Sequence, residues 1–146
     1  MIYYRNDVRR SGIDRRALLS TARRLLIALG ERDSAVSLSL VGDDAIRSMN
    51  QEYRGKNMPT DVLSFSLDGG ADASVERLLG DVVISVDTAR RQAEAYGASL
   101  QREVYRLLIH GLLHLKGHDH EEAGERRLMR REERRLAETI ALPWPY

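Results

Sequence analysis

Cysteine is absent from this chain of 146 residues. Its absence excludes disulfides, thiolate nucleophiles, iron–sulfur clusters and zinc sites built on cysteine. Long apolar runs are also missing, because the longest, residues 107–115, is interrupted by two histidines and is too short to span a bilayer. The amino terminus has no apolar segment typical of a secretory signal. These features favour a soluble, cytoplasmic protein, and the length suits one domain over residues 1–146.

Neither sign of charge dominates, since 23 lysines and arginines face 22 aspartates and glutamates. Their distribution is uneven, because residues 1–30 contain seven arginines and two aspartates, whereas residues 31–90 contain six bases and eleven acids. A basic amino-terminal region could face a polyanion, whose phosphates lysine and arginine neutralise. The alternative is an ordinary solvated helix face.

Hydrophobic periodicity predicts an α+β protein whose strands fall mainly in the first half of the chain. Strands are expected at residues 2–4, 35–41, 62–67 and 79–87. Helices are expected at residues 15–30, 43–53, 87–97, 99–117 and 121–140. The expected helix caps are Ser11 or Asp14, Asp43, Asp87 and Ser99. The segment 68–76 is rich in glycine, aspartate and serine, which predicts an exposed turn or flap.

All four histidines lie in one segment, HGLLHLKGHDH, at positions 110–120. His110 and His114 are one helical turn apart, so their imidazoles share a face and can bind one metal ion. Gly117 is expected to end the helix, which lets His120 supply a third nitrogen, whereas His118 has the wrong offset to share that face. Three imidazoles favour Zn²⁺ and also permit Ni, Co or Fe. Three protein ligands leave a fourth position for water, as in catalytic zinc sites.

The spacing of His110, His114, Gly117 and His120 is also the frame of the metzincin proteases. Gly111, however, stands where those proteases need a glutamate as general base. Peptide hydrolysis by that mechanism is therefore excluded, while the metal site remains. Phosphodiester cleavage fits such a site better, because its transition state gathers negative charge that a metal ion and an arginine can stabilise.

The histidine segment resembles the signature of the YbeY endoribonucleases, which reads HGxLHLxGYDH. The upstream segment NQEYRGKNMPTDVLSFSL, at 50–67, is similar to that family's NxxYRxxDxPTDVLSFP, and LGDVVIS is similar to its GDIVIS strand. The similarity covers roughly residues 46–136. Three departures stand out: Asn57 replaces an aspartate, Ser66 a proline and His118 a tyrosine.

The resemblance implies a zincin-like fold, in which a small mixed four-stranded sheet packs against helices and the metal site lies on a helix–turn. It also implies a single-strand-specific, zinc-dependent endoribonuclease, a hydrolase acting in 16S rRNA 3′-end maturation and late-stage ribosome quality control. The implied partners are single-stranded RNA, ribosomal RNA and the small ribosomal subunit. Neither a membrane nor DNA is expected as a partner.

By position, the resemblance implies that His110, His114 and His120 bind one zinc ion. Arg54 is then expected to contact phosphate, and Arg54 and His114 are the expected catalytic residues. Asp119 could orient a ligand imidazole or could serve only the turn. His118 could act as an extra base or phosphate donor, or could be a packing substitute for tyrosine.

Two other functions stay open at this point. The first is an RNA- or ribosome-associated binding factor in which zinc only orders the carboxy-terminal turn. The lack of an evident general base near His110 is consistent with this function. The second is a metallohydrolase of a non-nucleic substrate. A fourth protein ligand would indicate a structural zinc, whereas three histidines in a basic cleft would indicate a nuclease.

Overall fold

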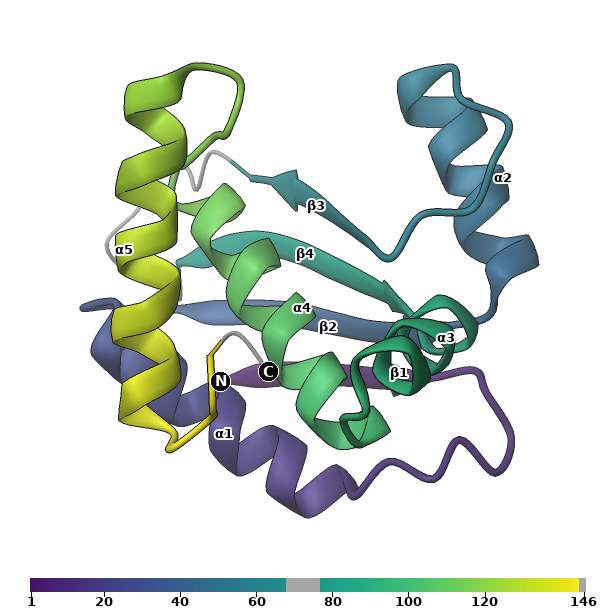
Figure 1. The fold of residues 1–146 in the computed structure, drawn as a ribbon, viewed down its shortest axis with the longest axis horizontal. Coiled ribbons are helices and arrows are strands. Elements are labelled where there is room, and N and C mark those ends of the chain that lie inside the picture. The colour runs from purple at the N-terminus through teal and green to yellow at the C-terminus, as the bar shows by residue number, and fades with distance from the viewer. Residues whose placement is uncertain (68–76, 145–146) are drawn as a thin grey trace.

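The computed structural model describes residues 1–67 and 77–144, and Figure 1 shows helices packed around one sheet. The predicted turn at 68–76 lies outside the described residues. The strands are β1 (Ile2–Asn6), β2 (Ala35–Val41), β3 (Val62–Ser66) and β4 (Leu78–Ser85). The helices are α1 (Arg15–Ala28), α2 (Asp43–Arg54), α3 (Val86–Tyr96), α4 (Leu100–Leu115) and α5 (Ala123–Thr139). All nine elements occur close to where the sequence predicts them.

The sheet is mixed and has the strand order β1-β2-β4-β3. The β1–β2 and β2–β4 pairs are parallel, whereas β3 is antiparallel to β4 and lies at one edge. The run of β-branched residues in β4 is buried, as expected for a strand covered on both faces. The α+β class and the small mixed four-stranded sheet packed against helices are thereby confirmed.

Two apolar clusters lie on opposite faces of the sheet, because neighbouring residues of a strand point to opposite sides. Val82 and Ile84 of β4 join the larger cluster with α1, α4 and α5, whereas Val83 joins the smaller cluster beneath α2. Helix α4 crosses the sheet in Figure 1 and is apolar around most of its circumference, which is typical of a central buried helix. No helix in the described parts of the chain could cross a membrane.

The starts of α2 and α3 differ from the expected capping pattern. Asp43 and Asp87 are not N-caps; Gly42 and Ser85 occupy those positions. The Asp43 carboxylate instead accepts hydrogen bonds from the Ser85 and Thr88 hydroxyls, both at 2.7 Å. The Asp87 carboxylate accepts from the backbone N–H of Asp43 at 2.9 Å. Each aspartate therefore serves the neighbouring helix, which sequence spacing alone does not reveal.

The expected caps Asp14 and Ser99 are confirmed, because their side chains accept hydrogen bonds from backbone N–H groups in the first turns of α1 and α4. The Ser99 cap fixes the beginning of α4, the helix that carries two of the histidines. Such a cap satisfies one of the backbone donors that a helix start leaves without an intrahelical partner.

Gly111 sets how closely α4 approaches the sheet. A Cβ atom at this position would lie 2.7 Å from Val82 Cγ1 and 3.1 Å from Ser64 Oγ, so no larger residue fits without movement. The Ser64 hydroxyl also donates a hydrogen bond to the Gly111 carbonyl at 2.9 Å. Position 111 therefore faces the sheet, and the close packing fixes His110 and His114 relative to β3.

Candidate metal centre

Three histidines converge where α4 ends. One ring nitrogen from each of His110, His114 and His120 lies within 4.8 Å of the other two. The Nε2 atoms of His110 and His114 are 3.0 Å apart. The ring centroid of His120 is 5.8 Å from that of His110 and 5.4 Å from that of His114. This group of nitrogens could hold a metal ion.

The chain reversal after α4 brings His120 back toward the helix. The backbone N–H of Gly117 donates to the His114 carbonyl, and that of His118 donates to the Leu113 carbonyl, both at 3.0 Å. Gly117 has a φ of 91°, a left-handed conformation that glycine adopts at little cost. These bonds complete the helix end in the manner of a Schellman turn, as the glycine predicted.

The neutral form of His114, which favours metal binding, is stabilised by its surroundings. Burial lowers the pKa of His114, and the nearby imidazoles of His110 and His120 and the Arg54 guanidinium lower it further against the opposing effect of Asp119. A lowered pKa keeps His114 neutral near pH 7, so a ring lone pair is available to a metal. A set of three imidazole nitrogens and no sulfur suits Zn²⁺ among common metals.

The histidines open into a polar cleft of about 500 Å³. Its walls come from the end of α2 and the following loop, from β3, and from the turn after α4. Arg54, the last residue of α2, and Lys56 bring two cations to the cleft, although they are far from the histidines in sequence. The lining residues are Arg54, Lys56, Thr60, Asp61, Val62, Ser64, His110, His114, Asp119, His120 and Glu121.

Asp119 and His118 differ in placement. The Asp119 carboxylate accepts a hydrogen bond from the backbone N–H of His120 at 2.7 Å, and it lies 3.7 Å from His120 Nδ1. Asp119 thus shapes the turn and also lies beside the imidazole of His120. His118 is not among the residues that line the cleft, and its backbone closes the end of α4.

Asp61, at the rim of the cleft, is held by a chain of side-chain contacts. Its carboxylate accepts from the Val62 backbone N–H at 2.8 Å and from the Gln92 amide at 3.2 Å. Gln92 in turn accepts from the Arg106 guanidinium at 3.3 Å, and Arg106 pairs with the fully buried Glu103. This chain joins α3 and α4 to the beginning of β3, so it fixes one wall of the cleft.

Sequence reasoning missed Glu133 of α5. This glutamate is 8% exposed, and its Oε2 atom lies 3.9 Å from His110 Nδ1. A carboxylate behind a ring nitrogen orients an imidazole and raises its basicity. Its position in the sequence could have indicated that it points inward, because Glu133 shares a helix face with Met129 and Leu136, both of which are buried.

The fold and the site together define a class: a mixed α+β protein with a candidate metal centre at the end of a central helix, beside an arginine. Comparison with known sequences names the family. The profile of the family described as Endoribonuclease YbeY matches residues 4–141. The chain belongs to the YbeY family of endoribonucleases, which confirms the enzyme class expected from the sequence.

Individual relatives agree with this assignment. A protein of Carboxydothermus hydrogenoformans, named Endoribonuclease YbeY, is 50% identical over 76% of this chain and 76% of its own length. A protein of Geobacter metallireducens with the same name is 44% identical over 87% of this chain and 85% of its own length. A solution structure of a Thermotoga maritima protein, 26% identical, superposes with a TM-score of 0.66 and covers 96% of this chain and 89% of that one.

Proposed function

We propose that this chain, as one domain, is a zinc-dependent endoribonuclease that cuts single-stranded RNA in its polar cleft. The observation that carries the proposal is the meeting of three histidine nitrogens within 4.8 Å in a cleft that also holds Arg54. The proposed ligands of one zinc ion are His110, His114 and His120. A bound zinc ion would supply Lewis-acid chemistry, polarising the scissile phosphate and lowering the pKa of water.

Arg54 is the proposed phosphate-binding residue. A guanidinium can donate two parallel hydrogen bonds to the non-bridging oxygens of a phosphodiester, which places the scissile phosphate against the histidine group. The same donors stabilise the negative charge that gathers on these oxygens in the transition state. Lys56 adds a second cation on the same side of the cleft.

Two carboxylates are the proposed positioning groups. The Glu133 carboxylate lies 3.9 Å from His110 Nδ1 and would orient that ring through its charge. The Asp119 carboxylate accepts a hydrogen bond from the His120 backbone N–H and lies 3.7 Å from His120 Nδ1. Each leaves the other ring nitrogen of its histidine directed at a metal. His118 has no proposed part in the chemistry, because it does not line the cleft.

The proposed biological substrate follows from the family resemblance. It is ribosomal RNA, which the enzyme would cut in the cytoplasm during 16S rRNA 3′-end maturation and late-stage quality control of the small ribosomal subunit. A binding factor with a purely structural zinc is disfavoured, because the donor group found among the described residues has three members and leaves a position for water. Arg54 and Lys56 suit the phosphates of a nucleic acid, and Asp61, Asp119 and Glu121 line the same cleft.

Cleavage of an end-labelled RNA, offered as a single strand and as the matched duplex, tests this proposal. The zinc-loaded protein should cut the single strand and spare the duplex, and chelation should stop cleavage until zinc is restored. Equal cleavage of both forms would contradict the single-strand specificity. The chemistry of the product ends identifies the attacking group, since a 2′,3′-cyclic phosphate requires attack by the RNA 2′-hydroxyl.

A further inference from the structure

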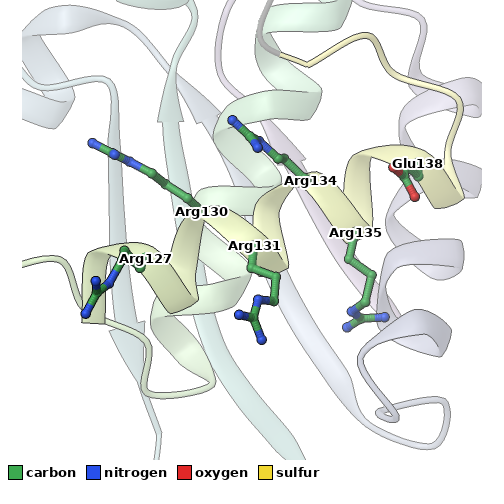
Figure 2. A pocket seen from close by; sticks show the side chains of 6 residues that line it. All are labelled: Arg127, Arg130, Arg131, Arg134, Arg135 and Glu138. Carbon is green, nitrogen blue, oxygen red and sulfur yellow. The ribbon is translucent and has the colours of Figure 1, made fainter. Parts of the chain in front are cut away.

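A second charged hollow lies on α5, away from the histidine cleft. It has a volume of about 630 Å³, and five of its six lining side chains are arginines. Figure 2 shows the five arginines in two neighbouring rows along the helix, with Arg130 and Arg134 in one row and Arg127, Arg131 and Arg135 in the other. We call this surface the arginine face; its residues are Arg127, Arg130, Arg131, Arg134, Arg135 and Glu138.

Most of these arginines have no acidic partner among the residues that the structure describes. Arg135 pairs with Glu132 at 2.8 Å and donates to the Ala28 carbonyl of α1. For the other four arginines, no ion pair or side-chain hydrogen bond is found among residues 1–67 and 77–144. All four are exposed. Four solvated cations therefore lie side by side on one helix.

This crowding has an energetic cost. Arginines at spacings of three and four residues are neighbours on a helix surface, and like charges at that distance repel and destabilise the helix. Among the described residues, Glu138 is the one acid that lines the hollow. A bound polyanion would remove the repulsion, because each guanidinium would then face a negative group.

The shape and chemistry of the face favour a phosphodiester backbone. Residues 127 and 134 are about 10 Å apart along the axis at 1.5 Å per residue, so the face extends beyond a single phosphate. Guanidinium groups match phosphate oxygens with bidentate hydrogen bonds. No aromatic side chain of residues 1–67 or 77–144 lines the hollow, so recognition here would depend on the backbone and not on base stacking.

A membrane surface fits less well. An interfacial helix inserts an apolar face among lipids, but the apolar face of α5 is already buried through Met129, Leu136 and Ala137. The helix is also fixed to the protein at its far end, because Arg24 of α1 donates to the Thr139 carbonyl. These contacts leave the arginines of α5 and the half-exposed Leu128 available to a partner, and one apolar side chain is not an apolar face.

We propose that the arginine face of α5 binds the phosphodiester backbone of the RNA substrate outside the segment that is cleaved. Helix α5 begins three residues after His120, and Arg127 lies in its first turns. The arginine face therefore follows the cleft closely in the chain, and an RNA strand that leaves the cleft and passes the exposed Glu121 and Glu122 would reach it. This inference rests on the proposed function, because it takes RNA as the substrate.

The test measures binding, and not cleavage, on metal-stripped protein with poly(U) as the probe. Arg130→Gln combined with Arg134→Gln removes one row of the face and keeps good helix formers at both positions. The matched control combines Arg32→Gln and Arg102→Gln, two exposed arginines in the loop after α1 and on α4. Circular dichroism confirms that each variant is folded.

The expected result is a weaker affinity and a smaller salt dependence for the α5 variant alone. With a slope of about 0.7 per phosphate contact on a single strand, loss of two contacts lowers the slope of log K against log salt by about 1.4. The control should keep the native slope. Equal slopes of log K against log salt in the two variants, or equal losses of affinity for poly(U) in the two, would overturn the inference.

Two further probes separate RNA from other anions. If the α5 variant loses binding to polyglutamate or to vesicles of anionic lipid while its affinity for poly(U) is unchanged, the inference is wrong. Failure of the proposed function gives a different result. If native protein binds poly(U) through α5 but never cuts RNA, the proposed nuclease activity is wrong and the inference about RNA binding by the arginine face still holds. Native protein that does not bind poly(U) would overturn it.

Discussion

The histidine cleft and the arginine face are both polar hollows, but they are built in opposite ways. The cleft gathers side chains from α2, β3, α4 and the turn after α4, and several of them are partly buried. The arginine face comes from a single helix, and its side chains are exposed. The cleft therefore depends on the tertiary fold, whereas the face depends only on helical spacing.

The two regions also differ in how their charges are satisfied. Asp61 and Asp119 in the cleft accept hydrogen bonds from backbone N–H groups, and burial, the neighbouring imidazoles and Arg54 lower the pKa of His114 and keep it neutral. Most arginines of the face have no such partner among the described residues. Groups held by hydrogen bonds suit a chemical step, and exposed cations suit graded electrostatic binding. Variants in the cleft should consequently change turnover, and variants on the face should change salt-dependent affinity.

The largest expected effect is that of His114→Ala. Loss of one of three nitrogens should release the metal and lower cleavage by more than the 10–100-fold that loss of an outer-shell partner typically costs. Metal content by atomic absorption and cleavage of a single-stranded RNA measure the two effects. His118→Ala is the matched control and should keep both. Full cleavage by metal-free His114→Ala protein would remove the basis for treating the cleft as a metal site.

Arg54→Ala should have the next largest effect. The variant should keep its zinc but lose about 100-fold in turnover, the usual result of removing one donor that stabilises a developing charge. Arg54→Lys should recover part of the rate, because it restores the charge without the bidentate geometry. If Arg54→Ala instead weakened RNA binding without lowering turnover, and changed its salt dependence as an α5 variant does, the contrast between the cleft and the arginine face would be wrong.

A smaller effect is expected for Glu133→Gln. This change keeps the shape of the side chain and removes the charge behind His110, so zinc affinity should fall by about 10- to 100-fold. Competition with a chromogenic chelator measures this affinity independently of catalysis. Glu125→Gln, on an exposed position of the same helix, is the control. An unchanged affinity in Glu133→Gln would show that Glu133 serves only packing.

The smallest expected effect is on stability as pH falls. The folded-state pKa of His114 is lowered, so the unfolded chain takes up a proton near the ordinary histidine pKa that the folded chain takes up only at lower pH. The free energy of unfolding of metal-free protein should therefore decrease as pH falls from neutral through this range. Denaturant titrations of native and His114→Ala protein isolate the contribution. Parallel profiles of the free energy of unfolding against pH in the two proteins would contradict a contribution from His114.

Local spacing predicted the parts of the molecule that depend on local geometry. The strands, the end of α4 at Gly117 and the meeting of His110 with His114 follow from strand and helix periodicity and from a glycine stop signal. The position of Arg54 in the cleft came from family resemblance, since nothing in its own sequence surroundings links it to residues some 60 positions later.

The features that sequence spacing did not reveal all depend on contacts between elements. Glu133 reaches His110 only because α5 packs beside α4. Asp43 and Asp87 were expected to cap their own helices, but the starts of α2 and α3 lie together, so each carboxylate serves the other helix. The arginines of α5 were visible in the sequence, but their lack of acidic partners among the described residues was not.

The most direct test of the central claim is a zinc titration of metal-stripped protein, followed by the initial rate of single-stranded RNA cleavage. The account predicts that the rate rises in proportion to added zinc and reaches a plateau at one equivalent per chain. His114→Ala protein should give no such rise. A cleavage rate that is independent of zinc, with the stripped protein fully active, would contradict the assignment of the three histidines to a catalytic metal centre.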